Sequence, residues 1–141
     1  MSEKPPGHLP DPTNVIGNLW VGDRFDAAKF DGLLICVLED GNIIAPDSRS
    51  RAIWMPVLSD QVAYQSRLDA IAAKIKDSLS GKVMVYCNSG SERSPLCAAW
   101  YLSKYHDMTL EEAYRFLMSK RAIVANRTYW IKPELRTYVG T

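Results

Sequence analysis

Three short runs of apolar residues limit the folds that are open to this chain. They are Leu33–Leu38, Ala52–Val57 and Lys82–Tyr86, the last of which is apolar after its initial lysine. A strand with one solvent-facing side alternates apolar and polar residues, whereas these runs are almost wholly apolar, as strands covered on both faces require. They predict three buried strands at the centre of one sheet.

Helices are predicted between and after these strands. The patterns that predict them are the apolar period from Leu68 to Leu79, the helix start Ser94-Pro95 and the capping box Thr109-Leu110-Glu111-Glu112. We also expect a hairpin over 14–22, a short helix over 23–30 and a last short helix from Pro133 to about Tyr138. This order of elements predicts an α/β fold with a central, mostly parallel sheet flanked by helices.

Charge and composition exclude several classes of protein. Lys and Arg total 17 against 16 Asp and Glu, so the net charge does not favour binding to nucleic acid. We therefore expect no stable nucleic-acid partner. No apolar run approaches the roughly 20 residues that cross a bilayer, and three cysteines do not make a disulfide framework. We therefore expect a cytoplasmic monomer without a membrane partner, with a flexible proline-rich arm over 1–12 and a single domain over 13–141.

The residues best suited to catalysis and anion binding follow the predicted strand 82–86, in the loop from Cys87 to Arg93. Backbone N–H groups of a tight loop, together with the positive end of the next helix, form a concave site for oxyanions. Gly90 supplies the backbone freedom for the curl, and the Arg93 guanidinium can bind two phosphate oxygens at once. The same positive potential favours the thiolate form of Cys87. We expect the backbone of the other loop residues to line the site: Asn88, Ser89, Ser91 and Glu92.

An alternative is that Cys87 is a buried thiol and Arg93 a solvated residue. The spacing argues against chance, because Cys36 and Cys97 have Asn42 and Ser103 six positions later, where Cys87 has an arginine. Cys87 is therefore the candidate nucleophile.

Cys87, Gly90, Arg93 and Ser94 match the signature Cys-x-x-Gly-x-x-Arg-Ser/Thr, and the chain resembles the cysteine-dependent protein tyrosine phosphatases, specifically the small atypical dual-specificity phosphatases. The similarity extends to 18–22, to the region ending at Asp60 and to 108–114, and covers nearly everything from residue 13 onward. The resemblance implies a protein tyrosine phosphatase-like fold and one phosphatase catalytic domain over 13–141. It also implies hydrolysis of a phosphomonoester in a phosphorylated protein or peptide, in two steps through a phosphocysteine and without a metal or cofactor.

By the same resemblance, Asp60 is the expected general acid and then base, although it lies closer to the cysteine in sequence than is usual in the family. The alternatives are that Asp60 caps the following helix and that Asp47 is the acid. Ser94 is expected to hydrogen-bond the sulfur when it leaves in the second step.

Two residues depart from the family pattern. Tyr86 stands where the family usually has His, and a phenol cannot become a cation near neutral pH. Glu92 occupies a position that is usually small, and we expect it to point to solvent or toward a Lys or Arg, because its charge would repel a bound phosphate.

These departures leave other functions open. One is a catalytically weak, phosphate-binding pseudophosphatase, and another is a phosphatase of a non-protein substrate such as an RNA 5′-phosphate, a sugar or a lipid phosphate. A redox or sulfur-transfer protein is a third, and Cys36 is considered as a disulfide partner of Cys87. Lys120, Arg121 and Arg127 are interpreted as ordinary surface charges, with a basic rim as the alternative.

Overall fold

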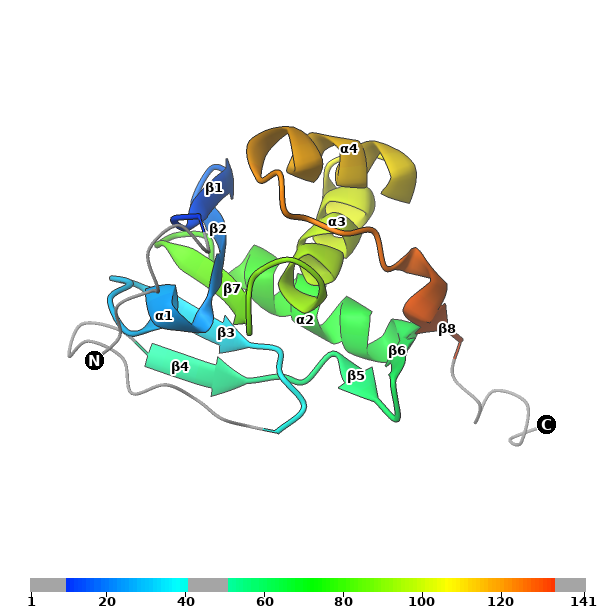
Figure 1. The fold of residues 1–141 in the computed structure, drawn as a ribbon, viewed down its shortest axis with the longest axis horizontal. Coiled ribbons are helices and arrows are strands. Elements are labelled where there is room, and N and C mark those ends of the chain that lie inside the picture. The colour runs from blue at the N-terminus through cyan, green and yellow to red at the C-terminus, as the bar shows by residue number, and fades with distance from the viewer. Residues whose placement is uncertain (1–9, 41–50, 134–141) are drawn as a thin grey trace.

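A computed structural model describes residues 10–40 and 51–133, and its main element is a five-stranded sheet (Figure 1). In spatial order the strands are β1 (Thr13–Ile16), β2 (Leu19–Asp23), β7 (Val83–Cys87), β3 (Leu33–Cys36) and β4 (Arg51–Trp54). β1 is antiparallel to β2, and all other neighbours are parallel. The predicted α/β fold with a central, mostly parallel sheet is confirmed.

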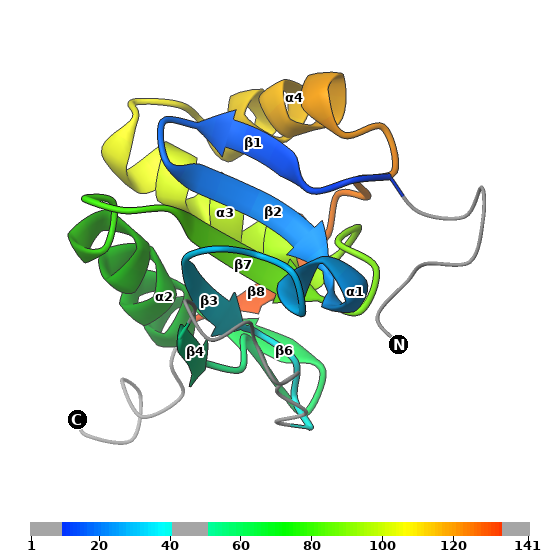
Figure 2. The same cartoon turned by 90° about the vertical axis from the view of Figure 1, so that its left-hand side faces the viewer.

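Helices cover both faces of this sheet unequally. The helices are α1 (Arg24–Ala27), α2 (Gln65–Asp77), α3 (Arg93–Tyr105) and α4 (Leu110–Lys120). Figures 1 and 2 show α2 and α3 on one face, with α4 outside α3, and the short α1 on the other. Alternate residues of β7 follow this division, because Val85 and Cys87 join the larger core beneath α2 and α3, whereas Met84 and Tyr86 join a small core beside α1.

A second, three-stranded sheet was not expected from the sequence. It contains β5 (Leu58–Ser59), β6 (Val62–Tyr64) and β8 (Ile131–Lys132), and the short helix η1 (Thr128–Trp130) precedes β8. Asp60 and Gln61 form the two-residue turn between β5 and β6, both with positive φ (50° and 65°), as the tight turns of hairpins require. Leu58 and Ala63 are buried, so this small sheet adds to the larger core.

Local signals placed several elements correctly. The hairpin over 14–22 is formed by β1 and β2, and Asp23 caps α1 by accepting from two backbone N–H groups. The capping box of α4 is present, with Glu112 N donating to Thr109 Oγ1 at 3.0 Å and Thr109 N donating to Glu112 Oε1 at 2.8 Å.

Other expectations differ in extent or lie outside the described residues. The helix predicted over 23–30 is shorter, because α1 ends at Ala27, and α3 begins at Arg93, just before Ser94-Pro95. The predicted helix after Pro133 and residues 1–9 of the predicted arm lie outside the described residues. No helix in the described part of the chain is long and apolar enough to span a membrane.

Candidate active site

Cys87 is the last residue of β7, the central strand of the sheet, and its side chain is 1% exposed. Its Sγ lies 3.3 Å from Ser94 Oγ, and the backbone N–H of Ser94 donates to it at 3.4 Å. Both contacts come from the first turn of α3, where the helix dipole adds positive potential. The structure thus brings two predicted site residues together around a single sulfur.

The loop after Cys87 is tightly curled at Gly90. This residue has a φ of +72°, and a Cβ atom there would lie 2.5 Å from Arg121 Nη2 and 2.8 Å from the Gly22 carbonyl oxygen. Any other residue would therefore suffer backbone strain and overlap. The loop is also closed internally, because Ser89 Oγ and Ser91 Oγ are 2.6 Å apart.

Arg121 supports this loop from the protein interior, so its interpretation as a surface charge was wrong. The residue is 2% exposed, and it donates to the carbonyl of Gly90 at 2.9 Å and to that of Ser89 at 3.2 Å. Its Nη1 donates to the carbonyl of Asp11 at 2.8 Å and to Thr13 Oγ1 at 3.1 Å. One guanidinium therefore ties the loop to the segment that leads into β1.

Burial lowers the pKa of Arg121, while the negative charges of Asp26 and Asp23 oppose this shift. Both aspartates are buried near the start of α1. Arg121 is thus a buried cation that contacts the loop and is stabilised by the charges of two buried carboxylates.

Arg93, the predicted phosphate clamp, is paired with Glu39, a residue that the sequence analysis did not single out. Arg93 Nε donates to Glu39 Oε1 at 2.5 Å and Nη2 donates to Oε2 at 3.1 Å, so the pair is bidentate. These hydrogen bonds are the main cause of the raised pKa of Arg93, with burial opposing and with further contributions from the charges of Glu39, Cys87 and Glu92. The Nε–Nη2 edge of Arg93 is therefore engaged by a carboxylate.

Glu92 points away from the loop toward an arginine, as predicted. Its Oε2 accepts from Arg127 Nη2 at 2.6 Å and from Nε at 3.0 Å. The Arg127 guanidinium lies 5.8 Å from the ring centre of Tyr129 and 5.6 Å from that of Trp130, within the range of cation–π contacts. The Glu92 charge is thus directed to a partner outside the anion site.

Asp60 is not brought close to Cys87. It is exposed in the β5–β6 turn, which Figure 1 shows at the lower end of this hairpin and apart from the loop that joins β7 to α3. The alternative that Asp60 caps the next helix is wrong, because the N-cap of α2 is Tyr64, without a side-chain hydrogen bond. Asp47 lies outside the described residues.

The three cysteines are free, and they differ in their surroundings. Cys36 pairs in register with Tyr86 and belongs to the core beside α1, whereas Cys87 belongs to the core on the opposite face of the sheet. The two side chains therefore point to opposite faces, which disfavours the disulfide that the sequence analysis considered. Burial raises the pKa of Cys36, opposed by hydrogen bonds with the Leu38 backbone and the Tyr86 side chain, and burial raises the pKa of Cys97.

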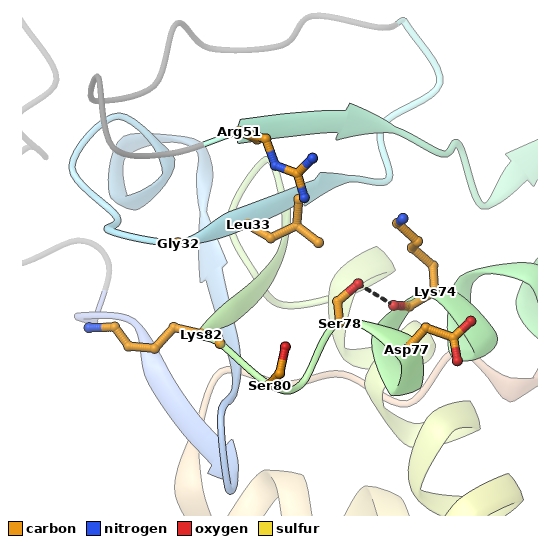
Figure 3. Close-up of a pocket in the computed structure, with 9 residues that line it drawn as sticks. Gly32, Leu33, Arg51, Lys74, Asp77, Ser78, Ser80 and Lys82 are labelled. Atoms are coloured by element: carbon orange, nitrogen blue, oxygen red, sulfur yellow. Dashed lines mark hydrogen bonds between the residues drawn. The ribbon is translucent and has the colours of Figure 1, made fainter.

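A cavity of about 420 Å³ lies at the opposite edge of the sheet, near the amino ends of β3, β4 and β7 (Figure 3). Arg51 and Lys74 extend toward it, whereas Lys82 points away. The cavity lies beside the carboxyl end of α2, whose carbonyl groups disfavour an anion. It is therefore separate from the site around Cys87. Within 10–40 and 51–133, no three His, Cys, Asp or Glu side chains gather as metal ligands would.

The chain is similar to known proteins in sequence and in fold. The sequence model of the dual specificity phosphatase catalytic domain matches residues 23–136. Dual specificity protein phosphatase 5 of Rattus norvegicus is 31% identical over 125 residues, which are 81% of this chain and 32% of that protein. The putative tyrosine phosphatase 123R of Invertebrate iridescent virus 6 is 25% identical over 130 residues, 86% of this chain and 88% of the viral protein. The chain thus spans about a third of the first relative and most of the second.

Solved structures show the same fold. The crystal structure of human DUSP28 has a TM-score of 0.69 at 18% identity, covering 87% of this chain and 89% of that chain. The human tyrosine phosphatase-like serine/threonine/tyrosine-interacting protein also has a TM-score of 0.69 at 18% identity, covering 85% and 90% of the two chains.

Proposed function

The chain belongs to the dual specificity phosphatase family, and from this premise we propose that it hydrolyses phosphorylated proteins or peptides through a phosphocysteine intermediate. The family assignment confirms the identification that was made from Cys87, Gly90, Arg93 and Ser94. The observation that carries the proposed chemistry is the Cys87 sulfur, held by two hydrogen bonds at the start of α3, the helix that begins at Arg93.

In the first step, the Cys87 thiolate attacks phosphorus. A sulfur–phosphorus bond forms, the ester phosphorus–oxygen bond breaks, and the leaving oxygen takes a proton from Asp60, the proposed general acid. The positive end of α3, the loop N–H groups of 88–93 and the Arg93 guanidinium stabilise the charge on the three other phosphoryl oxygens.

In the second step, water attacks phosphorus and gives a proton to Asp60, which now acts as the base, and the sulfur leaves as a thiolate while inorganic phosphate forms. The Ser94 hydroxyl, 3.3 Å from Sγ, stabilises this leaving thiolate by donating to it.

Asp60 remains our proposed general acid, and its place on an exposed turn requires the β5–β6 turn to approach the loop when substrate binds. We expect Asp60→Asn to lower turnover of an alkyl phosphate by roughly 10² to 10⁴-fold, and to lower that of an aryl phosphate less, because a phenolate leaves without full protonation. Equal turnover by wild type and Asp60→Asn on the alkyl ester would overturn this role.

The proposed function is tested with a chromogenic aryl phosphate. We expect wild-type protein to release the chromophore and Cys87→Ser to release none, with Cys36→Ser as the matched control because Cys36 lies on the other face of the sheet. Orthovanadate, which resembles the transferring phosphoryl group, should inhibit. Hydrolysis that survives in folded Cys87→Ser would refute the mechanism.

A specific observation also favours a second candidate, a phosphate-binding protein with weak turnover. The Arg93 guanidinium is engaged by a carboxylate, and Tyr86 replaces the histidine usual in the family. Binding of a phosphopeptide without a burst of product release would favour this candidate.

A further inference from the structure

The Glu39–Arg93 pair occupies the group that is proposed to bind phosphate. Glu39 accepts from Nε and Nη2 of Arg93, the two donors on one edge of the guanidinium. A guanidinium uses such an edge to bind a carboxylate or a phosphate in bidentate fashion. The Glu39 carboxylate therefore stands where two phosphate oxygens would bind.

This contact contributes little to the stability of the fold. The side chains of Arg93 and Glu39 are 25% and 40% exposed, and ion pairs at such positions are weak because water screens both charges. Glu39 lies three residues past the end of β3, in a segment without regular structure. The carboxylate can consequently leave Arg93 without disturbing the core.

The surroundings of Glu39 define what can displace it. β3 and β7 are parallel neighbours, so Glu39 lies at the same edge of the sheet as Cys87. The next residue, Asp40, is also an exposed acid. When a phosphate binds Arg93, the displaced Glu39 carboxylate stays close to it, and the two negative charges repel each other. This repulsion is relieved only if a cation accompanies the phosphate.

We propose that Glu39 is a specificity-determining residue, which holds Arg93 until a substrate supplies a cation in exchange. This inference rests on the proposed function and narrows its substrate class to phosphorylated peptides with a Lys or Arg close to the phosphorylated residue. The substrate cation pairs with Glu39, and the released guanidinium binds the phosphoryl group. Substrates with acidic residues at the same positions are disfavoured, because they add to the repulsion.

The test uses phosphotyrosine peptides in which one flanking residue is Arg, Ala or Glu, placed in turn at two positions on each side. We expect kcat/KM of the wild type to be about tenfold higher for Arg than for Glu at the best position, and Glu39→Gln to reduce this ratio to about two. We also expect orthovanadate, which carries no cation, to inhibit Glu39→Gln about three- to tenfold more tightly than wild type. Asp40→Asn is the matched control, since it removes the same charge one residue away, and it should change both quantities less.

Each outcome has a separate meaning. If wild type and Glu39→Gln hydrolyse the peptides with equal Arg-to-Glu ratios of kcat/KM, a substrate cation does not replace Arg93 at Glu39. The inference would then be overturned, and the proposed function would stand. Weaker vanadate inhibition of Glu39→Gln would show that Glu39 orients Arg93 for phosphate and would also overturn the inference. Failure of both proteins to hydrolyse any peptide or to bind vanadate would overturn the proposed function itself.

Discussion

The loop from Cys87 to Arg93 is held in two different ways on its inner and outer sides. On the inner side, buried Arg121 donates to the carbonyls of Ser89 and Gly90. On the outer side, partly exposed ion pairs engage Arg93 and Glu92. An exposed pair is screened by water, whereas removing a buried cation leaves polar groups without partners in a low dielectric. The comparison indicates that the inner side fixes the shape of the loop and that the outer side can vary to suit the substrate.

The largest effect is expected from Arg121→Met. The substitution leaves the carbonyls of Ser89 and Gly90 without their donor and removes the cation beside Asp23 and Asp26, so we expect unfolding free energy to fall by about 3–5 kcal/mol. Urea denaturation measures this loss. Arg115→Met on the exposed face of α4 is the matched control and should change stability by less than about 0.5 kcal/mol. A loss below about 1 kcal/mol in Arg121→Met would show that the inner side is no stronger than the outer one.

A second effect separates close packing from backbone strain. Gly90 and Gly17 both have positive φ, but a Cβ at Gly90 meets Arg121 and Gly22, whereas nothing lies within 4 Å of one at Gly17. We expect Gly17→Ala to cost about 1 kcal/mol from strain alone and Gly90→Ala about 2–4 kcal/mol. Denaturation curves for the two variants give the comparison, and equal losses would mean that Arg121 does not pack against the loop.

These contrasts also show which parts of the site could be predicted from sequence. Cys87, Gly90, Arg93 and Ser94 lie within eight positions, so spacing alone placed them on one loop, and the capping box at Thr109 depends only on its own turn. Arg121 carries no such local signal. It follows directly after α4, and one of its partners, Asp11, is 110 positions away in sequence. Its spacing of four from Leu117 continues the buried face of α4, but its charge led to a surface interpretation.

The position of Asp60, the proposed general acid, could not be predicted from local sequence either. Asp60 was placed in a loop after a strand, but the turn that carries it belongs to a second sheet completed by β8, which lies about 70 residues later in the chain. The pairing of β6 with β8 sets the position of Asp60, and two-residue strands such as β8 are too short for a clear alternation of apolar and polar residues. Glu39 was missed because a single acid after a strand is indistinguishable from an ordinary surface charge.

A smaller effect tests the residue directly before the nucleophile. Tyr86 is fully buried on the α1 side, and Tyr86→His places there a side chain that can carry a positive charge near neutral pH. We expect the rate of alkylation by iodoacetamide to rise a few-fold at mildly acidic pH. Because Tyr86 also contacts Cys36, both rates are measured in a Cys36→Ser background, and Cys97 contributes little because burial raises its pKa. Superimposable rate–pH profiles would exclude an influence of residue 86 on the thiolate.

The smallest effect is expected from Glu92→Gln, which breaks the outer ion pair with Arg127. Arg127 is held above neighbouring rings as well as by Glu92, and Ala125 N donates to the carbonyl of Ser91 at 2.8 Å, so the loop keeps a backbone link to this segment. We therefore expect a loss of stability smaller than that of Gly17→Ala, and one that disappears as salt is raised, because salt screens exposed charges. Arg127→Gln should lose more than Glu92→Gln, because it also removes the ring contacts, and the double variant should lose little more than Arg127→Gln alone. If the loss instead persists at high salt or approaches that of Arg121→Met, the outer side also fixes the shape of the loop, and the inner side does not act alone.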